Sequence, residues 1–541
     1  MATQHTAIVP GTVHLVDVSG EAPTGAKMRD GIQLVPRPTD NPEDPLNWSK
    51  RRKWLALATV VVYTFGTGLP LTLQYSILAA ITADTGISTA TLVEGTGYMF
   101  LLLGFGCLFW QPIALTYGRR GVYLASTLAT VPLMVWTAYS KSSGEWFAHR
   151  LILGFFVAPI EALPEVSIPD IFFAHERGGM MGVYVFSLFG SNFLAPLIGG
   201  WFNEAFGWKW TMYFGAIFAA VAFFILFFFM EETMYFRQGL EGLEDEQDEA
   251  AMTTTASGEK GDKSSSSNQT VSESPAVIYV KPTLAQRLAW FRKMDGRPTY
   301  QHMLKTMYRP LIYFYQFPIV AWAGFIYGIH LCWYQVLNGT ASPVLANAPY
   351  NWSSGLVGCI YTGPIVGAAF GCYWAGSIAD EITLWLARRN KGVREPEHRL
   401  WPLLLTAVLA AIGLIMWGAG AQHHAHWAVL AVGLGILTFS VVAGGPVALS
   451  YNIDCYKDIS GDTTTSVILV RNVMGFAIAY GITPWYTNMG LQNCFIMAGF
   501  LALGCTLTFL FMVWKGKHLR RGSAERYWKY AAQSSSKLNG R

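Results

Sequence analysis

Two glutamates in one long apolar stretch are the residues of this chain best placed to do chemistry. Glu161 and Glu165 are four positions apart, so they share one face of a helix. Arg150 precedes them in the same stretch. Two carboxylates this close do not both ionise cheaply, which favours a group that takes up and releases a proton. If the stretch lies in a bilayer, we expect Glu161 or Glu165 to bind a proton or a cation, with Arg150 modulating that site.

A structural interpretation of the same stretch needs no proton. Glu165 lies close enough to the predicted end of its helix to be a solvated gate residue, and Pro159 and Pro164 then only kink the helix. The two interpretations differ in one measurement. Glutamine in place of either glutamate abolishes a proton-dependent activity only if the carboxyl itself carries the proton.

The composition of the chain points to a membrane. Hydrophobic residues make up 52% of the 541 residues and charged residues 13%, whereas a typical soluble domain carries roughly 25% charged residues. The 20 tryptophans suit a protein anchored at two membrane interfaces. This composition excludes a secreted disulfide scaffold, a nucleic-acid binder and an ordinary cytosolic enzyme. The seven cysteines include no CxxC pair and are expected to be small buried hydrophobes.

Twelve segments are long and apolar enough to cross a bilayer as helices, which takes about 20 residues each. We therefore expect an all-α membrane protein. The predicted spans are 54–78, 90–114, 121–140, 147–168, 180–202 and 209–230, followed by 311–335, 355–378, 401–420, 427–450, 464–486 and 493–514.

Cationic residues gather on one side of these spans. The opposite side holds little beyond Lys141 and Lys209. Because Lys and Arg concentrate in cytoplasmic loops, both termini are predicted to be cytoplasmic, as an even number of spans requires. The first fifty residues lack an apolar core followed by a cleavage site, so no signal peptide is expected. The residues on the cationic side are Lys50, Arg51, Arg52, Lys53, Arg119, Arg120, Arg177, Arg388, Arg389, Lys391, Arg394, Arg399, Lys457, Lys515, Lys517, Arg520 and Arg521.

Five regions follow from this pattern. Helical bundles are predicted at 54–230 and 311–514, and a cytoplasmic tail at 515–541. A disordered cytoplasmic segment is predicted at 1–53, and a largely disordered cytoplasmic linker, with an acidic run at 241–249, at 231–310. Within the linker, the apolar residues Leu284, Leu288, Trp290 and Phe291 alternate with Arg287, Arg292 and Lys293. They indicate a short helix that lies either on the inner leaflet or against the bundle.

The two bundles share a repeat. Phe105-Gly-Cys107 ends the second predicted span and Phe370-Gly-Cys372 ends the eighth, each followed by a pair of arginines. Matching motifs at equivalent places indicate two pseudo-symmetric six-helix bundles. Such bundles rock about a central cavity and expose it to each side in turn.

Several motifs resemble those of one family, the major facilitator superfamily. Gly118–Arg120 resembles the end of its loop signature, and Gly376–Asp380 resembles the beginning of the same signature in the second half. In the first half, Gln111 and Leu115 stand where the signature has Gly and Asp, which shifts the weight of the charge relay to Asp380.

Further strings are similar to particular branches of that family. Arg150–Gly154 resembles the fourth-span arginine motif of proton-coupled members, and Gly190–Gly200 resembles the fifth-span motif of drug:proton antiporters. Pro164–Val166, Asp170–Gly178 and Arg394–Leu400 resemble a fungal twelve-span branch of drug, organic-cation and polyamine transporters. The resemblance covers roughly residues 40–520. It implies the twelve-span two-bundle fold and a location in the plasma membrane.

The other candidates fall into three groups. A substrate cavity is expected at Asn192, Tyr315, Gln316, Trp322, Tyr327 and Asn472, where aromatic rings could hold organic cations or simply pack. Tyr313, Trp333 and Tyr334 of the seventh predicted span could line the cavity in the same way. A conformational role is expected where small residues and proline let helices approach and flex, at Gly190, Pro196, Gly199 and Gly200. Gating is expected at Gly118, Arg119, Arg120, Asp170, Arg177, Asp380, Arg388, Arg389, Asp454 and Arg471, with Asp454 and Arg471 predicted to pair at the cytoplasmic edge rather than to contact substrate.

Two sequons, at Asn338 and Asn351, follow the seventh predicted span on the outer side and are candidate glycosylation sites. His423, His424 and His426 lack nearby carboxylate or thiol partners, so they are expected to form a solvated turn and not a metal site.

The sequence contains no GxxxxGK[ST] loop, so transport would be driven by an ion gradient or by the substrate gradient itself. We expect no enzyme activity and no cofactor. The first hypothesis is a proton-coupled exporter of small organic molecules such as a drug or a metabolite. The second is a proton-coupled importer of polyamines or other organic cations, and the third is a non-transporting membrane sensor. The expected partners are the substrate, protons and the lipid bilayer, and the protein is expected to be monomeric.

Overall fold

The computed structural model describes residues 9–14, 28–29, 32–33, 39, 41–235, 283–291 and 299–538. The predicted acidic, disordered part of the linker and the predicted helix residues Arg292 and Lys293 lie outside the described residues.

Within these residues, twelve helical segments are long and apolar enough to span a membrane, which confirms the predicted number. The first half comprises α1 (Lys50–Thr72) with η3 (Leu73–Ser76), α2 (Leu78–Thr85), α3 (Thr89–Tyr117), α4 (Arg119–Tyr139), α5 (Ser143–Val157) with α6 (Pro159–Ile171), α7 (Ala174–Phe206) and α8 (Trp208–Phe229). The second half comprises α12 (Pro318–Ala346), α13 (Ser354–Cys359) with α14 (Thr362–Tyr373), η4 (Trp374–Ile378) and α15 (Ala379–Arg389), η5 (Pro396–Leu400) with α16 (Leu403–Gln422), α17 (Trp427–Cys455), η6 (Lys457–Ile459) with α18 (Ser460–Met489), and α19 (Leu491–Leu507) with α20 (Phe509–Leu538). The remaining elements are η2 (Pro45–Asn47), α10 (Leu284–Arg287), α11 (Tyr300–Gln316), and the short strands β1 (Val13–His14), β2 (Met28–Arg29), β3 (Ile32–Gln33) and β4 (Val393–Arg394).

The glycine of the repeated motif, Gly106 in the first half and Gly371 in the second, has the same structural role in both halves. A Cβ on Gly106 of α3 would lie 2.7 Å from the Cβ of Ala158, between α5 and α6. A Cβ on Gly371 of α14 would lie 2.9 Å from the carbonyl oxygen of Phe439 in α17. In both halves the glycine therefore lets the second span touch the fourth. This is the physical basis of the sequence repeat.

The seventh span does not begin where the sequence predicted. The apolar run from 311 is broken at Phe317, whose backbone is extended, and α12 starts at Pro318. A residue before proline disfavours helical geometry, and proline suits the first turn of a helix. The residues before the break form the separate helix α11, which packs between α3 and α18.

The described part of the linker packs against the first half. Arg120 Nη1 donates to the carbonyl of Leu288 (2.6 Å), and the Phe291 ring fills the space beside Gly121. Trp290 and Phe291 keep exposed fractions of 38% and 50%. Of the two predicted arrangements, contact with the bundle is the one observed for these residues.

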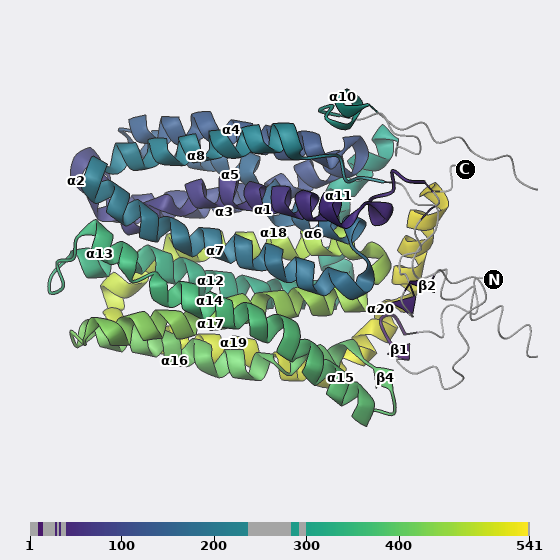
Figure 1. Ribbon diagram of the computed structural model, residues 1–541. Coiled ribbons are helices and arrows are strands. Elements are labelled where there is room, and N and C mark those ends of the chain that lie inside the picture. The colour runs from purple at the N-terminus through teal and green to yellow at the C-terminus, as the bar shows by residue number, and fades with distance from the viewer. Residues whose placement is uncertain are drawn as a thin grey trace, which may run out of the picture.

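The two halves lie side by side, with the first half above the second in Figure 1. They touch along two seams, α3 against α18 and α7 against α13 and α14. A Cβ on Gly104 of α3 would lie 2.8 Å from the Asn472 side chain of α18, so the first seam is close-packed. Gln111 of α3 extends this seam, because it hydrogen bonds to Thr465 and to the Gly461 carbonyl (3.2 Å) of α18.

β1 and α20 lie at the same end of the helix bundle, which we call the terminal end, and α2 and α13 lie at the opposite, far end (Figure 1). Parts of the segment predicted to be disordered at 1–53 are ordered there. β1 pairs antiparallel with β4, and the buried Arg520 of α20 donates to the Pro10 carbonyl (2.6 Å). Asp44 caps η2 through the Leu46 N–H. These polar partners order segments that lack an apolar pattern.

Candidate functional site

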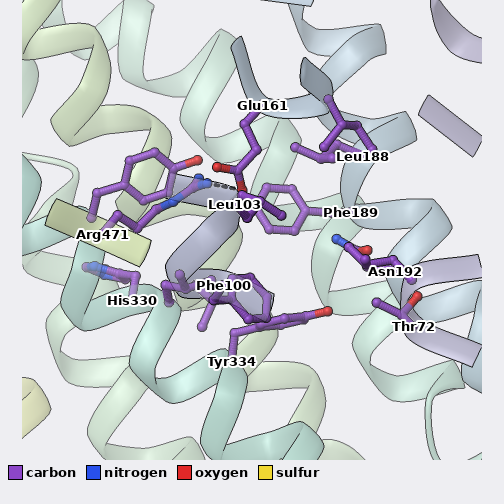
Figure 2. A pocket seen from close by; sticks show the side chains of 15 residues that line it. Thr72, Phe100, Leu103, Glu161, Leu188, Phe189, Asn192, His330, Tyr334 and Arg471 are labelled. Carbon is purple, nitrogen blue, oxygen red and sulfur yellow. Dashed lines mark ion pairs between the residues drawn. The ribbon is translucent and has the colours of Figure 1, made fainter. Parts of the chain in front are cut away.

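A cavity lies between the two halves (Figure 2). α1, α3, α6 and α7 line it from the first half, and α12, α17 and α18 from the second. Its wall is mostly apolar and aromatic, with one acidic and one basic side chain. The lining residues are Leu71, Thr72, Phe100, Leu103, Ile160, Glu161, Leu188, Phe189, Asn192, Tyr327, His330, Leu331, Tyr334, Val441 and Arg471.

Glu161 and Arg471 form an ion pair inside this cavity. Glu161 comes from α6 and Arg471 from α18, so the pair joins the two halves. Asn472 Nδ2 donates to Glu161 Oε2 (2.8 Å), and the guanidinium of Arg471 lies 4.5 Å from the centre of the Tyr327 ring. Glu161 is 9% exposed and Arg471 5% exposed. A low-dielectric site strengthens such a pair and makes either charge costly when alone.

Glu165 lies one helical turn beyond Glu161 on α6. Its Oε2 is buried and has no hydrogen-bond partner among the described residues. The two glutamates thus share a helix face, as predicted, but only Glu161 has a cationic partner. Burying an ionised carboxylate oxygen without a partner is expensive, which makes Glu165 the second group of interest.

Arg150 does not contact either glutamate. It is 1% exposed, its Nη1 donates to the Leu71 carbonyl (3.4 Å), and its guanidinium lies 5.0 Å from the Trp146 ring centre. Met99 Sδ is 3.7 Å from the same nitrogen. Arg150 therefore ties α5 to the end of α1, and any influence on Glu161 acts over a distance.

Four of the predicted cavity residues are in or beside the cavity. Asn192, Tyr327 and Tyr334 line it, and Asn472 holds the Glu161 carboxylate. Sequence reasoning missed Phe100, Phe189 and His330. On α12 a signal existed, because Tyr327, His330 and Tyr334 fall on one helical face at spacings of three and four residues.

Three other predicted cavity residues lie elsewhere. Tyr315 is 84% exposed near the end of α11, and the carbonyl of Gln316 accepts from Arg526 Nη1 (2.9 Å). Trp322 donates to Thr508 Oγ1 (3.1 Å) at the α12–α20 contact. The prediction failed for Tyr315 and Gln316 because the seventh span starts after them.

In the first half, Arg119 and Arg120 bind the loops around them. Arg119 pairs with Asp170 and donates to the Val166 carbonyl (2.8 Å). Arg120 donates to the carbonyls of Met230 and Phe227, both at 2.7 Å. The predicted gating residue Arg177 donates to the Pro169 carbonyl (3.3 Å).

Glu232 is a member of this group that the sequence did not indicate. Its carboxylate accepts the backbone N–H groups of Arg119 (3.0 Å) and Arg120 (3.1 Å) at the start of α4. Negative charge is favourable at a helix N-terminus. Gly118, with φ of 118°, makes room for it, because a Cβ there would lie 2.5 Å from Glu232 Oε2.

In the second half, the predicted Asp454–Arg471 pair is wrong. Asp454 instead binds Arg394 (3.3 Å) and Arg399 (3.2 Å), and Arg399 also binds Asp380. Arg471 reaches Glu161 because α18 begins at Ser460, which places Arg471 about 16 Å along the helix, near the middle of the candidate span Lys457–Met489.

Of the other predicted gating residues, Arg388 is exposed and Arg389 lies over the Trp385 ring (4.7 Å). Beside the Asp454 group, Lys517 and Arg520 both bind Glu395. Burial raises the pKa of the Glu395 carboxyl, but the hydrogen bonds from Lys517 and Arg520 outweigh that effect and hold the pKa below its ordinary value.

The fifth-span residues predicted to be conformational lie mostly at close contacts of α7. A Cβ on Gly199 would lie 2.7 Å from the Leu73 carbonyl, and one on Gly200 would lie 2.2 Å from the Ser354 carbonyl at the start of α13. The carbonyl of Pro196 approaches Gly358. Around Gly190, a Cβ would meet only the Phe65 ring at 3.9 Å, so this glycine is less constrained.

The two sequons differ sharply in access. Asn338 has an exposed fraction of 0% inside α12, and its Oδ1 accepts from the Tyr361 hydroxyl (3.1 Å). A glycan at Asn338 is incompatible with this packing, so that prediction is wrong. Asn351 is exposed in the loop between α12 and α13. The seven cysteines are all free, and no group of metal-ligating side chains occurs within the described ranges.

A twelve-span helical bundle with a buried, charged cavity between two halves defines a membrane transporter. Residues 55–456 match the family model described as Major Facilitator Superfamily. The chain belongs to the major facilitator superfamily and is a secondary transporter, not an enzyme.

Known proteins of similar sequence or fold agree with this assignment. The chain is 29% identical to an uncharacterized MFS-type transporter of Schizosaccharomyces pombe, over 96% of this chain and 94% of the relative. It is 25% identical to the efflux pump FUBT of Fusarium oxysporum, over 96% of this chain and 80% of the relative. The fold matches the proton:xylose symporter XylE with a TM-score of 0.57, at 13% identity, over 86% of this chain and 97% of XylE.

Proposed function

We propose that this transporter exports a small organic cation in exchange for protons, and that Glu161 is the group at which the two compete. The observation that carries the proposal is the Glu161–Arg471 pair, which joins the two halves inside the cavity. Breaking such a buried pair by removing one charge costs about 3–5 kcal/mol. A proton or an organic cation that neutralises Glu161 removes the attraction to Arg471 and so favours separation of the halves.

The rest of the cavity supports a cationic substrate with an apolar body. Phe100, Phe189, Tyr327 and Tyr334 present rings that attract cations as well as apolar groups. Glu165 adds a second carboxyl within one turn of the first, at which a proton and the substrate cation can compete in the same way. Arg150, at the far end of the same span, then modulates the site through the position of α1 and α5.

The proposal also assigns the direction of transport, the orientation of the protein and the membrane in which it lies. Export is favoured by the antiporter-like motif of α7 and by the similarity to FUBT, an efflux pump. The terminal end would face the cytoplasm of a plasma-membrane protein that works as a monomer. Opening at that end would require the Arg119–Asp170 and Asp454–Arg399 groups to rearrange, so these groups would control access to the cavity.

Proton exchange can be tested with a permanently charged probe, which cannot cross the bilayer unaided. Purified protein is reconstituted into vesicles that contain a pH-sensitive dye, and (4-phenylbutyl)trimethylammonium is added outside. We expect a substrate-dependent proton flux that Glu161→Gln abolishes, whereas Glu204→Gln, at an exposed carboxylate of the far end, preserves it. Cation movement without proton flux, or an unchanged flux in Glu161→Gln, contradicts the exchange mechanism. The sign of the flux under an imposed gradient separates export from import.

A further inference from the structure

A group of polar side chains with incomplete hydrogen bonds lies at one side of the cavity, where Tyr334 forms part of the wall. Tyr334, which lines the cavity, is 3% exposed, and neighbouring Tyr75 of η3 is 2% exposed. The two hydroxyls interact with each other, and the Tyr334 hydroxyl also interacts with Asn338, but none of these contacts reaches hydrogen-bond geometry among the described residues. Asn338, with an exposed fraction of 0%, accepts from the Tyr361 hydroxyl, but its Nδ2 likewise makes no hydrogen bond there.

These groups are held in place by their neighbours. The Tyr334 ring meets the Tyr75 ring edge-on, with ring centres 6.5 Å apart, and the Phe193 ring on another side, at 5.7 Å. The Tyr361 hydroxyl fixes the Asn338 amide. Rigidly held hydroxyl and amide groups whose hydrogen bonds are incomplete are costly in an apolar interior, because buried polar groups in proteins normally make full hydrogen bonds. A molecule that enters the cavity would supply them.

The positions of Tyr334 and Asn338 along α12 determine how far they lie from the Glu161–Arg471 pair, which is the charged centre of the cavity. Tyr327, beside Arg471, and Tyr334 and Asn338 share one face of this helix. The helical rise places Tyr334 about 10 Å from Tyr327 along the axis. In Figure 2, Glu161 and Tyr334 lie on opposite sides of the pocket, with Phe100 and Phe189 between them. The cavity therefore has a charged end, an aromatic middle and an uncharged, hydrogen-bonding end.

We propose that Tyr75, Tyr334 and Asn338 form a second subsite, which takes an uncharged, hydrogen-bonding group of the substrate such as an amide, a carbonyl or a hydroxyl. This inference rests on the proposed function, because it assigns the cationic group of the same molecule to Glu161. The substrate class is then an organic cation whose neutral polar group lies about 10 Å from its charge, across an apolar or aromatic body.

Binding of two matched probes to the purified full-length protein tests the subsite. The first probe is (4-phenylbutyl)trimethylammonium, and the second is the same molecule with a carboxamide on the ring carbon opposite the chain. Each neutral hydrogen bond contributes about 2- to 10-fold in affinity, so we expect the carboxamide to bind at least about 5-fold more tightly in calorimetric titrations. The double variant Tyr75→Phe/Tyr334→Phe keeps both rings and should bring the two affinities within about 2-fold.

Two further variants separate the subsite from the charged centre. Tyr63→Phe removes a buried hydroxyl that bonds Ser126, away from the cavity, and should leave the advantage of the carboxamide intact. Glu161→Gln should weaken both probes by the same factor. Equal affinities in the unaltered protein, or an advantage that survives the double variant, overturn the subsite. Unchanged binding of both probes in Glu161→Gln overturns the charged centre of the proposed function but leaves the subsite standing, and no measurable binding of either probe overturns both.

Discussion

Glu161 of α6 and Arg471 of α18 form an ion pair across the two halves of the transporter, and Asn472 adds a hydrogen bond to the same carboxylate. The pair therefore makes a contact between the two halves depend on the charge of one carboxylate. The halves of a rocking transporter must lose contacts on one side of the cavity as they gain them on the other. A contact made of two opposite charges is one that a proton or a cationic substrate can weaken selectively.

The two charges should therefore depend on each other for stability. Glu161→Gln leaves Arg471 buried without its counter-charge and should lower the free energy of unfolding by about 3–5 kcal/mol. Arg471→Gln should do the same. The double variant Glu161→Gln/Arg471→Gln should recover most of that loss, because two neutral amides can hydrogen bond to each other. Thermal unfolding in detergent measures this cycle.

Additive losses in the double variant would contradict a direct pair. The control is Glu204→Gln, since Glu204 is exposed and its Oε1 accepts only the N–H of Gly355 (2.8 Å) in the described structure. A substitution of the same type there should change the unfolding temperature little.

Glu232 should contribute more to the stability of the fold than its neighbour in sequence, Glu231. Its carboxylate accepts two backbone N–H groups at the start of α4 and also the Met234 N–H (3.0 Å). Charge-assisted hydrogen bonds contribute about 1.5–3 kcal/mol each, so Glu232→Ala should lower the free energy of unfolding by at least about 2 kcal/mol. Glu231→Ala, which removes a 21% exposed ion-pair partner of Arg52, should cost less, about 1 kcal/mol. Equal unfolding temperatures for the two variants would show that the cap is unimportant.

Much of the fold could be predicted from apolar length alone, because only helices satisfy the backbone in lipid. The sequence also singled out Glu161, since a carboxyl in an apolar run is rare whatever its partner, and this residue does line the cavity. The sequence did not show that Arg471 is the partner of Glu161. A sequence places Arg471 along a helix but does not say that η6 and α18 start early enough to carry it to the middle of the span.

Other misses have the same origin. In the sequence, the apolar stretch before Phe317 continues without a break into the seventh span. In the structure, the helix is interrupted before Pro318, so Tyr315 and Gln316 belong to α11 and do not line the cavity. The subsite residues Tyr75 and Asn338 were not predicted, because nothing in their local sequence shows that η3 and α12 face each other. Contacts between distant segments, rather than the elements themselves, are what the sequence left open.

The docking of the N-terminal strand should be sensitive to acid. Thr12 Oγ1 donates to Glu395 Oε2 (3.0 Å), and Arg520 Nη1 donates to the Pro10 carbonyl, while Arg520 Nη2 donates to Glu395 (2.7 Å). The pKa of Glu395 is lower in the folded protein than in the unfolded chain, so its contribution is fully present above the ordinary carboxyl pKa and is lost as the pH falls through the folded value.

Hydrogen exchange at Val13 and His14 should accordingly accelerate, after correction for intrinsic rates, as the pH falls below about 4.5. Glu395→Gln should show fast exchange already at neutral pH and little further change with acid. Lys517→Gln, which removes a more exposed partner of the same carboxylate, should shift the transition to higher pH without removing it. Exchange that is independent of pH in the unaltered protein would mean that the Glu395 charge does not hold the strand.

Glycosylation should distinguish the two sequons and report the orientation of the bundle. Asn351 is exposed, with φ of 48°, in the loop at the far end, whereas Asn338 is enclosed in α12. If the far end faces the lumen during synthesis, Asn351→Gln should remove an endoglycosidase-sensitive shift in gel mobility when the protein is made in a eukaryotic host. Asn338→Gln should leave that shift unchanged. A shift that depends on Asn338 would require α12 to unwind at that point and would contradict both the packing around Tyr361 and the subsite built on it.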